Sequence, residues 1–467
     1  MNVSVRISLL CGLLAMAALT GAAGAAAGTA ASGDVFPFKV AEATLDNGMQ
    51  VMAVPYDSPG TVAYYIVIRT GSRDEVEPGH SGFAHFFEHM MFRGTEKYSA
   101  EAYNDVLKHM GADSNAATYD DKTVYHIVGP ASALESMMDI ESDRFKNLKY
   151  GEDAFRTESL AVLGEYSKGV SNPVQPMFEK MRDLAFEKHT YKHTTIGFVQ
   201  DIKAMPGYYD YSLKFFDRFY RPENATLLVV GDVQPQRVFD LAKKYFGDWK
   251  KGYKPADIPV EPPQKEQKQA QIDWPNPTSP YLMLGYHVPA FSTTAVDSAA
   301  LDLAAQLLFS ESAPLYQDLV VKNQWVDFLQ GGPDLLRDPS LFMIFTRVKS
   351  DDLVPKVKAT IDRYIQKLQT EPVDASRLDR IKSHLRYDFA LGLDTPGDVA
   401  EQAAEAIALT GNIDAINQRF AQYQKVTPAD IQRIVGASFQ TRNETIVTLS
   451  HKADAAAKGT QGGANHE

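Results

Sequence analysis

The sequence predicts an α/β fold, an α+β sandwich of two homologous domains, each a mostly antiparallel sheet with helices packed on one face. Three observations support this prediction. Strand-like and helix-like segments alternate through the first half of the 467 residues. Residues 250–271 are rich in Pro, Lys and Gln, lack helical or strand periodicity, and are expected to link two domains. The second half faintly repeats the plan of the first.

The first predicted domain, residues 35–249, begins with a hairpin at residues 42–55, in which Asp46-Asn47-Gly48 favours a tight turn. A β-branched and aromatic run at residues 61–69 predicts a buried strand. The later expected elements are helices over 81–93 and 100–110, strands over 115–118 and 123–128, helices over 131–145 and 153–167, and a strand over 225–233.

The second predicted domain, residues 272–455, matches the first at two places. HMMF at residues 89–92 pairs with QLLF at 306–309, and RPENATLLVV at 221–230 pairs with QTRNETIVTL at 440–449. This pairing places Asp302, Ala305 and Gln306 opposite the first domain's two histidines and glutamate. The second domain is therefore expected to have the same fold but to lack the two histidines and the glutamate of the first.

Both ends of the chain are expected to lie outside the fold. Residues 1–27 have one early charge, Arg6, then an apolar run and small residues, which is typical of a secretory signal peptide. We expect export, to the periplasm if the organism is Gram-negative. Residues 456–467 are expected to form a disordered tail.

Composition excludes several classes of partner and site. The net charge of −12 and the lack of a basic tract argue against nucleic acid as a partner. No later stretch is long and apolar enough to anchor the mature chain in a membrane. Cys11, the only cysteine, lies in the predicted signal peptide, so His, Asp or Glu must hold any metal.

The clearest chemical pattern is H-x-x-E-H, formed by His85, Glu88 and His89. Residues i and i+4 share a helix face, so both imidazoles can reach one zinc ion at about 2.0–2.1 Å. Glu88 lies beside them, where it can take a proton from water on the metal. Chance gives this pattern in roughly one or two such sequences per hundred. However, Phe and Met residues surround it, and buried imidazoles need a partner or a metal.

A catalytic zinc commonly takes three protein ligands and leaves a fourth position for water. The predicted helix 153–167 offers Glu158 and Glu165, which are seven residues apart and share a face. One could bind zinc while the other accepts a hydrogen bond from a ligating imidazole. Spacing alone does not say which does which, and two exposed helical glutamates are the alternative.

Four blocks of the first half resemble the pitrilysin/insulinase family of zinc peptidases, whose members include mitochondrial processing peptidase. They resemble the family's active-site helix, edge strand, third-ligand helix and closing strand. The blocks are GFAHFFEHMMFRGT (82–95), GADSNAATYDDKTVYHI (111–127), TESLAVLGEY (157–166) and YRPENATLLVVGDV (220–233). The weaker second half fits the family's paired homologous domains.

The resemblance implies a role for each matching residue. It makes His85, His89 and Glu165 the ligands of one zinc ion per chain. It makes Glu88 the general base, and Glu158 the supporting carboxylate beside a ligand.

The resemblance also implies a substrate site at Asn115 and Ala116. A peptide would bind there as an extra strand on the sheet edge, so recognition would follow chain shape more than side chains. Enclosure between two domains would limit substrates to peptides or unfolded segments.

One segment departs from the family pattern. Members with a complete site carry an Arg and a Tyr, seven residues apart, in the second domain. In residues 315–327, Val320 and Asp327 stand in those places. We therefore expect a homologous subunit to supply the Arg/Tyr pair, as in the family's two-chain peptidases.

The predicted function is that of a zinc-dependent endopeptidase acting on peptides or unfolded segments. The alternative is a non-catalytic assembly subunit with the same fold, as in the core proteins of respiratory complexes. The intact set of His85, Glu88, His89 and Glu165 argues against that alternative.

Overall fold

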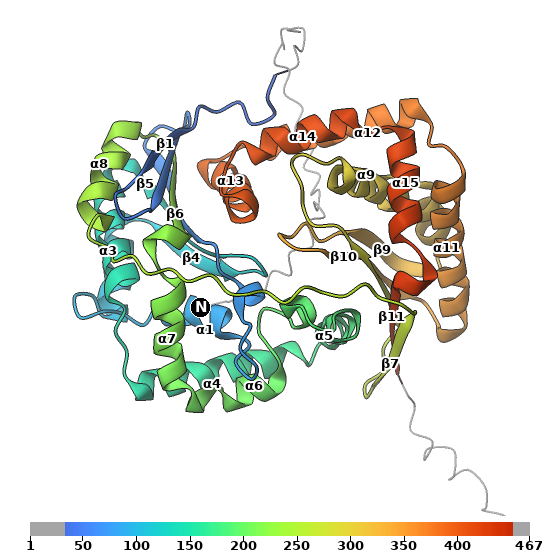
Figure 1. Ribbon diagram of the computed structural model, residues 1–467, viewed down its shortest axis with the longest axis horizontal. Helices are drawn as coiled ribbons and strands as arrows, with labels where there is room; N and C mark the ends of the chain where they lie inside the picture. The colour runs from blue at the N-terminus through green and yellow to red at the C-terminus, as the bar shows by residue number, and fades with distance from the viewer. Residues whose placement is uncertain (1–32, 452–467) are drawn as a thin grey trace, which may run out of the picture. The chain divides into compact units, whose positions relative to one another are not determined.

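Two β-sheets organise the protein in this computed structural model, which describes residues 33–451 (Figure 1). The predicted signal peptide and tail lie outside the described residues. The first sheet has the order β1-β2-β6-β3-β5-β4 and the second β7-β11-β8-β10-β9. The strands are β1 (Ala41–Thr44), β2 (Gln50–Pro55), β3 (Thr61–Ile68), β4 (Asp113–Thr118), β5 (Thr123–Pro130), β6 (Ala225–Gly231), β7 (Lys268–Trp274), β8 (Tyr281–Val288), β9 (Val326–Pro333), β10 (Ser340–Val348) and β11 (Glu444–His451).

Helices join and cover the strands of both sheets. In the first half these are α1 (Phe83–Met90), α2 (Ala100–Met110), α3 (Leu134–Asn147), α4 (Glu152–Gly169), α5 (Val174–Ala185), α6 (Val199–Ala204), α7 (Tyr209–Phe219) and α8 (Pro235–Phe246). In the second half they are α9 (Asp297–Phe309), α10 (Pro314–Tyr316), α11 (Val354–Thr370), α12 (Ala375–Leu391), α13 (Pro396–Thr410), α14 (Ala415–Lys425) and α15 (Pro428–Ser438). The predicted α/β class is confirmed.

The two sheets share one topology, which confirms the faint repeat in the sequence. Removing β1 leaves five strands whose order matches that of the second sheet. β2 runs parallel to β6, as β7 does to β11, and the other pairs are antiparallel. Asn224 and Asn443, which the sequence pairs, each donate from Nδ2 to a carbonyl oxygen five residues earlier.

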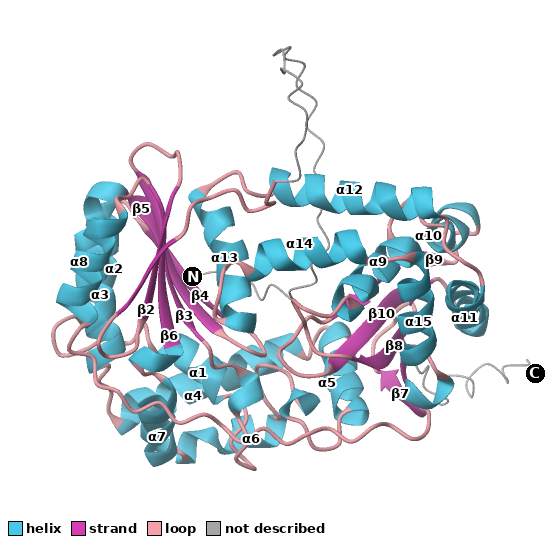
Figure 2. Cartoon of the chain, turned by 45° about the horizontal axis from the view of Figure 1, so that its top comes forward, coloured by secondary structure: helices cyan, strands magenta, loops and turns pink. Residues whose placement is uncertain are grey.

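Each sheet is covered on one face by helices of its own half, and on the other by a helix from the opposite half. Figure 2 shows α3 and α8 on one side of the first sheet and α13 on the other. Tyr65 of β3 belongs to the same buried cluster as Val399 and Ile407 of α13. In the second sheet, Met283 of β8 is buried with Met181 of α5. The halves therefore complete each other's cores.

Most expected elements differ from the structure by only a few residues at their ends, and two differences matter here. The helix expected over 81–93 is shorter, because α1 ends at Met90. The linker expected over 250–271 ends earlier, because residues from Lys268 onwards form β7. This strand was missed since it is polar at an edge of the sheet, with half-buried and exposed side chains alternating. No helix among residues 33–451 combines the length and apolar character that crossing a bilayer requires.

Candidate metal centre

The helix α1 brings the H-x-x-E-H residues together inside the first half. Apolar side chains, including Phe83, Phe86 and Phe87, bury most of its surface and fix it against the sheet and α7. His85 lies within this buried helix, whereas Glu88 and His89 are half-buried. The i, i+4 spacing places both imidazoles on one face, as predicted.

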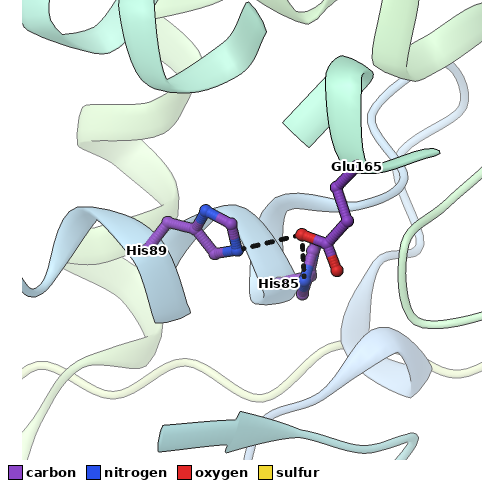
Figure 3. Close-up of side chains that lie close together, drawn as sticks. All are labelled: His85, His89 and Glu165. Atoms are coloured by element: carbon purple, nitrogen blue, oxygen red, sulfur yellow. Dashed lines mark ion pairs between the residues drawn. The ribbon is translucent and has the colours of Figure 1, made fainter. Parts of the chain in front are cut away.

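The helix α4 packs against α1 and supplies a carboxylate, Glu165, as the third member of the cluster (Figure 3). Glu165 Oε2 lies 3.6 Å from His85 Nε2 and 3.4 Å from His89 Nε2. One ligand atom from each of the three residues lies within 4.8 Å of the others, which makes them a group that could hold a metal ion. No other such group of three occurs among the described residues.

The spacing of these atoms fits a metal ligand set. Both distances exceed the 2.7–3.2 Å of a good N–H···O hydrogen bond. Ligand atoms about 2.0–2.1 Å from a tetrahedral zinc ion lie about 3.4 Å from one another. Two nitrogens and one carboxylate oxygen are also the donor types that zinc accepts when no thiolate is present.

Glu158 lies two turns before Glu165 in α4 and orients the His89 ring by contacting its other nitrogen. Its Oε1 accepts from His89 Nδ1 at 2.9 Å, which leaves Nε2 turned toward Glu165. Arg93 donates from Nε to the other oxygen of Glu158. The sequence pattern left the roles of the two glutamates open, and the structure places Glu165 with both imidazoles and Glu158 behind one of them.

Burial and charge shift the pKa values of these groups in opposite directions. Burial lowers the pKa of His85. It also lowers that of His89, but the hydrogen bond to Glu158 and the nearby Glu165 outweigh burial and raise the pKa to about 9. Burial raises the pKa values of both carboxyl groups, but their basic partners outweigh it and leave both below the usual range. Both carboxyl groups of this cluster are therefore held ionised by their basic partners.

Glu88 faces a different neighbour. Its Oε2 accepts a hydrogen bond of 2.6 Å from Thr118 Oγ1 at the end of β4. Thr118 belongs to the block that resembles the family's edge strand, but the sequence pattern alone assigned it no role. Arg93 was missed in the same way, although it continues the four-residue spacing of His85 and His89.

The strand β4 carries both predicted substrate-binding residues and forms one edge of the first sheet. Asn115 is exposed and Ala116 is buried, and they are paired with His126 and Tyr125 of β5. The opposite side of the β4 backbone has no strand partner among the described residues. These residues therefore lie at an open edge beside α1.

The two positions that depart from the family pattern lie in the second half. Val320 packs against the apolar core near α9 and α10. Asp327, in β9, forms ion pairs with Arg347 and Lys349. An aliphatic and an acidic side chain therefore stand where the family pattern has the basic Arg and the phenolic Tyr.

Comparisons with known proteins agree with this arrangement. Residues 51–197 match the family described as insulinase (peptidase family M16), and residues 209–385 match the peptidase M16 inactive domain. The chain is 30% identical over 417 residues to the zinc protease PqqE of Helicobacter pylori, across 87% of this chain and 91% of that protein. It is 25% identical over 418 residues to cytochrome b-c1 complex subunit 1 of Caenorhabditis elegans, across 86% of each.

A solved structure shows the same architecture. A protease from Helicobacter pylori superposes with a TM-score of 0.82 at 29% identity, covering 88% of this chain and 99% of that one. The repeated sheets, the helix with H-x-x-E-H and the full-length similarity all confirm the resemblance found in the sequence. The chain belongs to the M16, or insulinase, family of peptidases.

Proposed function

We propose that this protein is a zinc-dependent endopeptidase acting on peptides or unfolded segments. The observation that carries this proposal is the convergence of His85, His89 and Glu165, with Glu88 beside them. His85, His89 and Glu165 would hold one zinc ion. When bound, zinc lowers the pKa of a water molecule and polarises the scissile carbonyl.

The chain's own residues then divide the remaining work. The Glu88 carboxylate takes the proton of the attacking water and passes it to the leaving amine. Thr118 holds that carboxylate in place through its hydroxyl. The open edge of β4 at Asn115 and Ala116 binds the substrate backbone as an added strand. Glu158 keeps the His89 ring in the tautomer and orientation that a ligand needs.

Replacing the base tests this assignment. Glu88→Gln keeps the shape of the side chain but removes its basic group, so peptide cleavage should fall about 100-fold or more. Zinc content, measured by elemental analysis, should stay at one ion per chain. Glu371→Gln, at an exposed position of the second half, is the control and should leave cleavage unchanged. Retained cleavage in Glu88→Gln would contradict the role of Glu88.

We propose further that a homologous subunit supplies the missing Arg/Tyr pair. The support is that Val320 is a partly buried apolar residue packed against the core and that Asp327 forms ion pairs with two basic side chains. Mixing this chain with a related chain that lacks H-x-x-E-H should raise its peptidase activity sharply. The double substitution Val320→Arg with Asp327→Tyr should raise the activity of the lone chain. Full activity of the unaltered chain by itself would contradict this proposal.

A second candidate function, a non-catalytic assembly subunit, is favoured by the full-length similarity to the cytochrome b-c1 subunit. Metal analysis separates the two candidates, because an assembly subunit has no need of a bound ion. We also propose export to the periplasm, since residues 1–27 have the pattern of a signal peptide. Amino-terminal sequencing of the mature protein should find a start near Ala25 or Ala27.

A further inference from the structure

The amino-terminal end of α1 is held by a buried carboxylate that comes from outside the helix. The first N–H groups of any helix lack partners within it, and a side chain at the preceding residue commonly accepts from one of them. Here the preceding residue is Gly82, which has no side chain to offer. Glu75 takes over this role: Oε2 accepts from Gly82 N at 2.7 Å and Oε1 from Ala84 N at 2.6 Å.

The position of Glu75 makes this contact rigid. It follows a short 3₁₀ turn, Ser72–Asp74, and only 4% of its surface is exposed. Both carboxylate oxygens are used by the same helix end, which fixes its position and its rotation together. Burial raises the pKa of Glu75 well above its usual range, although the hydrogen bonds from the backbone of Ala84 and Gly82 oppose the shift.

A second carboxylate holds Ser81, the residue before Gly82. Asp201 of α6 accepts from the backbone N of Ser81 at 3.2 Å and from its Oγ at 2.6 Å. Gly82 has φ of 93°, and a Cβ there would lie 2.5 Å from the carbonyl oxygen of Ile196. Two carboxylates therefore fix the entry to α1, and Glu75 is the one that binds an N–H group within the helix itself.

This contact lies next to the metal centre. Ala84 directly precedes His85, and α1 has only eight residues, so its first turn carries one ligand and its second turn carries Glu88 and His89. A small rotation of the first turn would change the distance from His85 Nε2 to Glu165, which is 3.6 Å. It would move His89 less, because Glu158 holds that ring separately.

We propose that Glu75 is a positioning residue of the metal centre, whose carboxylate fixes the first turn of α1 and so sets the direction of His85. This inference rests on the proposed zinc-peptidase function. Glu75 acts through the backbone of Gly82 and Ala84 and touches neither the ligands nor the substrate edge. Its loss should therefore change the metal centre while leaving the binding of peptide at β4 in place.

The test replaces Glu75 and a matched glutamate elsewhere. Glu75→Gln turns one oxygen into an NH₂ group that faces a backbone N–H and can no longer accept from it. Glu444→Gln is the control, since Glu444 is 3% exposed, is equally well hydrogen-bonded, and lies in β11 of the second sheet. Both variants lose a buried carboxylate, but only one of them loses a contact to α1.

We expect the two variants to differ in their affinity for zinc. Glu75→Gln should weaken zinc affinity about tenfold in competition with a chromophoric chelator, as changes behind metal ligands commonly do. It should also alter the visible spectrum of bound cobalt(II) and lower kcat with little change in KM. Glu444→Gln should lose stability to urea but keep zinc affinity within about twofold of the unaltered chain.

Several results would overturn the inference. One is a folded Glu75→Gln variant with unaltered zinc affinity and cobalt spectrum, and another is an equal loss of affinity in Glu444→Gln. If Glu75→Gln does not fold, Glu75→Asp decides, because its shorter side chain keeps the carboxyl group but draws it back from Gly82 N and Ala84 N, so zinc binding should still weaken. Unaltered protein that binds zinc but cleaves no peptide even when mixed with the homologous subunit contradicts the proposed function alone, whereas unaltered protein that binds no zinc contradicts both.

Discussion

At the scale of single residues, the centre depends on side chains that hold other side chains. Glu158 orients His89, Arg93 pairs with Glu158, and Thr118 holds Glu88. The sharing of one helix face by His85 and His89 could be predicted from the sequence, because i, i+4 spacing in a helix is local geometry. Thr118 could not, because it reaches Glu88 from a strand 30 residues away in the chain.

The hydroxyl of Thr118 should matter for turnover. Thr118→Val keeps the volume but removes the donor to Glu88, and a hydrogen bond to a charged group contributes about 1.5–3 kcal/mol. We expect kcat for a peptide to fall about tenfold or more, with zinc content unchanged. Thr118→Ser keeps the donor and should recover most of the rate. A Ser variant as slow as the Val variant would show that the hydroxyl is not the cause.

At the scale of elements, the helices α1 and α4 differ in what they require of glycine. Gly82 adopts a left-handed conformation and packs directly on the backbone of Ile196, so a larger residue does not fit. Gly164 lies inside α4, next to Glu165, with open space where a Cβ would be. The helices themselves were predictable from periodicity. The first residue of α1 was not, because tertiary contacts at Gly82 determine where the helix starts.

Alanine at these two positions should have opposite effects on stability. Gly82→Ala should lower the free energy of unfolding by about 3 kcal/mol, since it combines backbone strain with a steric clash. Gly164→Ala should raise it by about 0.5–1 kcal/mol, because alanine favours a helix over glycine. Urea unfolding of both variants measures the difference. Equal changes in the same direction would contradict this account of α1.

At the scale of the whole chain, the halves exchange helices and share charged contacts. The helix α5 completes the core of the second sheet and α13 that of the first, a pairing that local patterns in the sequence could not predict. The turn between β4 and β5 also joins the halves. Asp121 in this turn accepts from the backbone N of Arg337 and from the hydroxyl of Tyr191, both at 2.7 Å.

The burial of Asp121 should make the free energy of unfolding depend on pH. Burial raises the pKa of Asp121 to about 6, although the hydrogen bonds from Arg337 and Tyr191 oppose the shift. Because the folded state then holds a proton that the unfolded state releases near pH 4, stability should fall as pH rises from about 4 to 6. Above pH 6 this contribution should stay constant.

Asp121→Asn removes that titration. The fall in the unfolding free energy between about pH 4 and 6 should become smaller by up to about 3 kcal/mol. Asp57→Asn, at an exposed position, is the control and should keep the full slope. Urea unfolding across a pH series measures both slopes. The same slope in Asp121→Asn and in the unaltered protein would contradict the assignment.

The composition of β4 affects the tendency of this exposed sheet edge to aggregate with other copies of the chain. An unpaired strand edge can form backbone hydrogen bonds with a strand of another molecule, and bulky aliphatic or aromatic residues stabilise such stacks of strands. Between Asp113 and Thr118 the strand carries only Asp, Ser, Asn, Ala and Thr. The backbone therefore supplies most of the binding capacity of this edge, and its small or polar side chains give little support to a durable stack of strands.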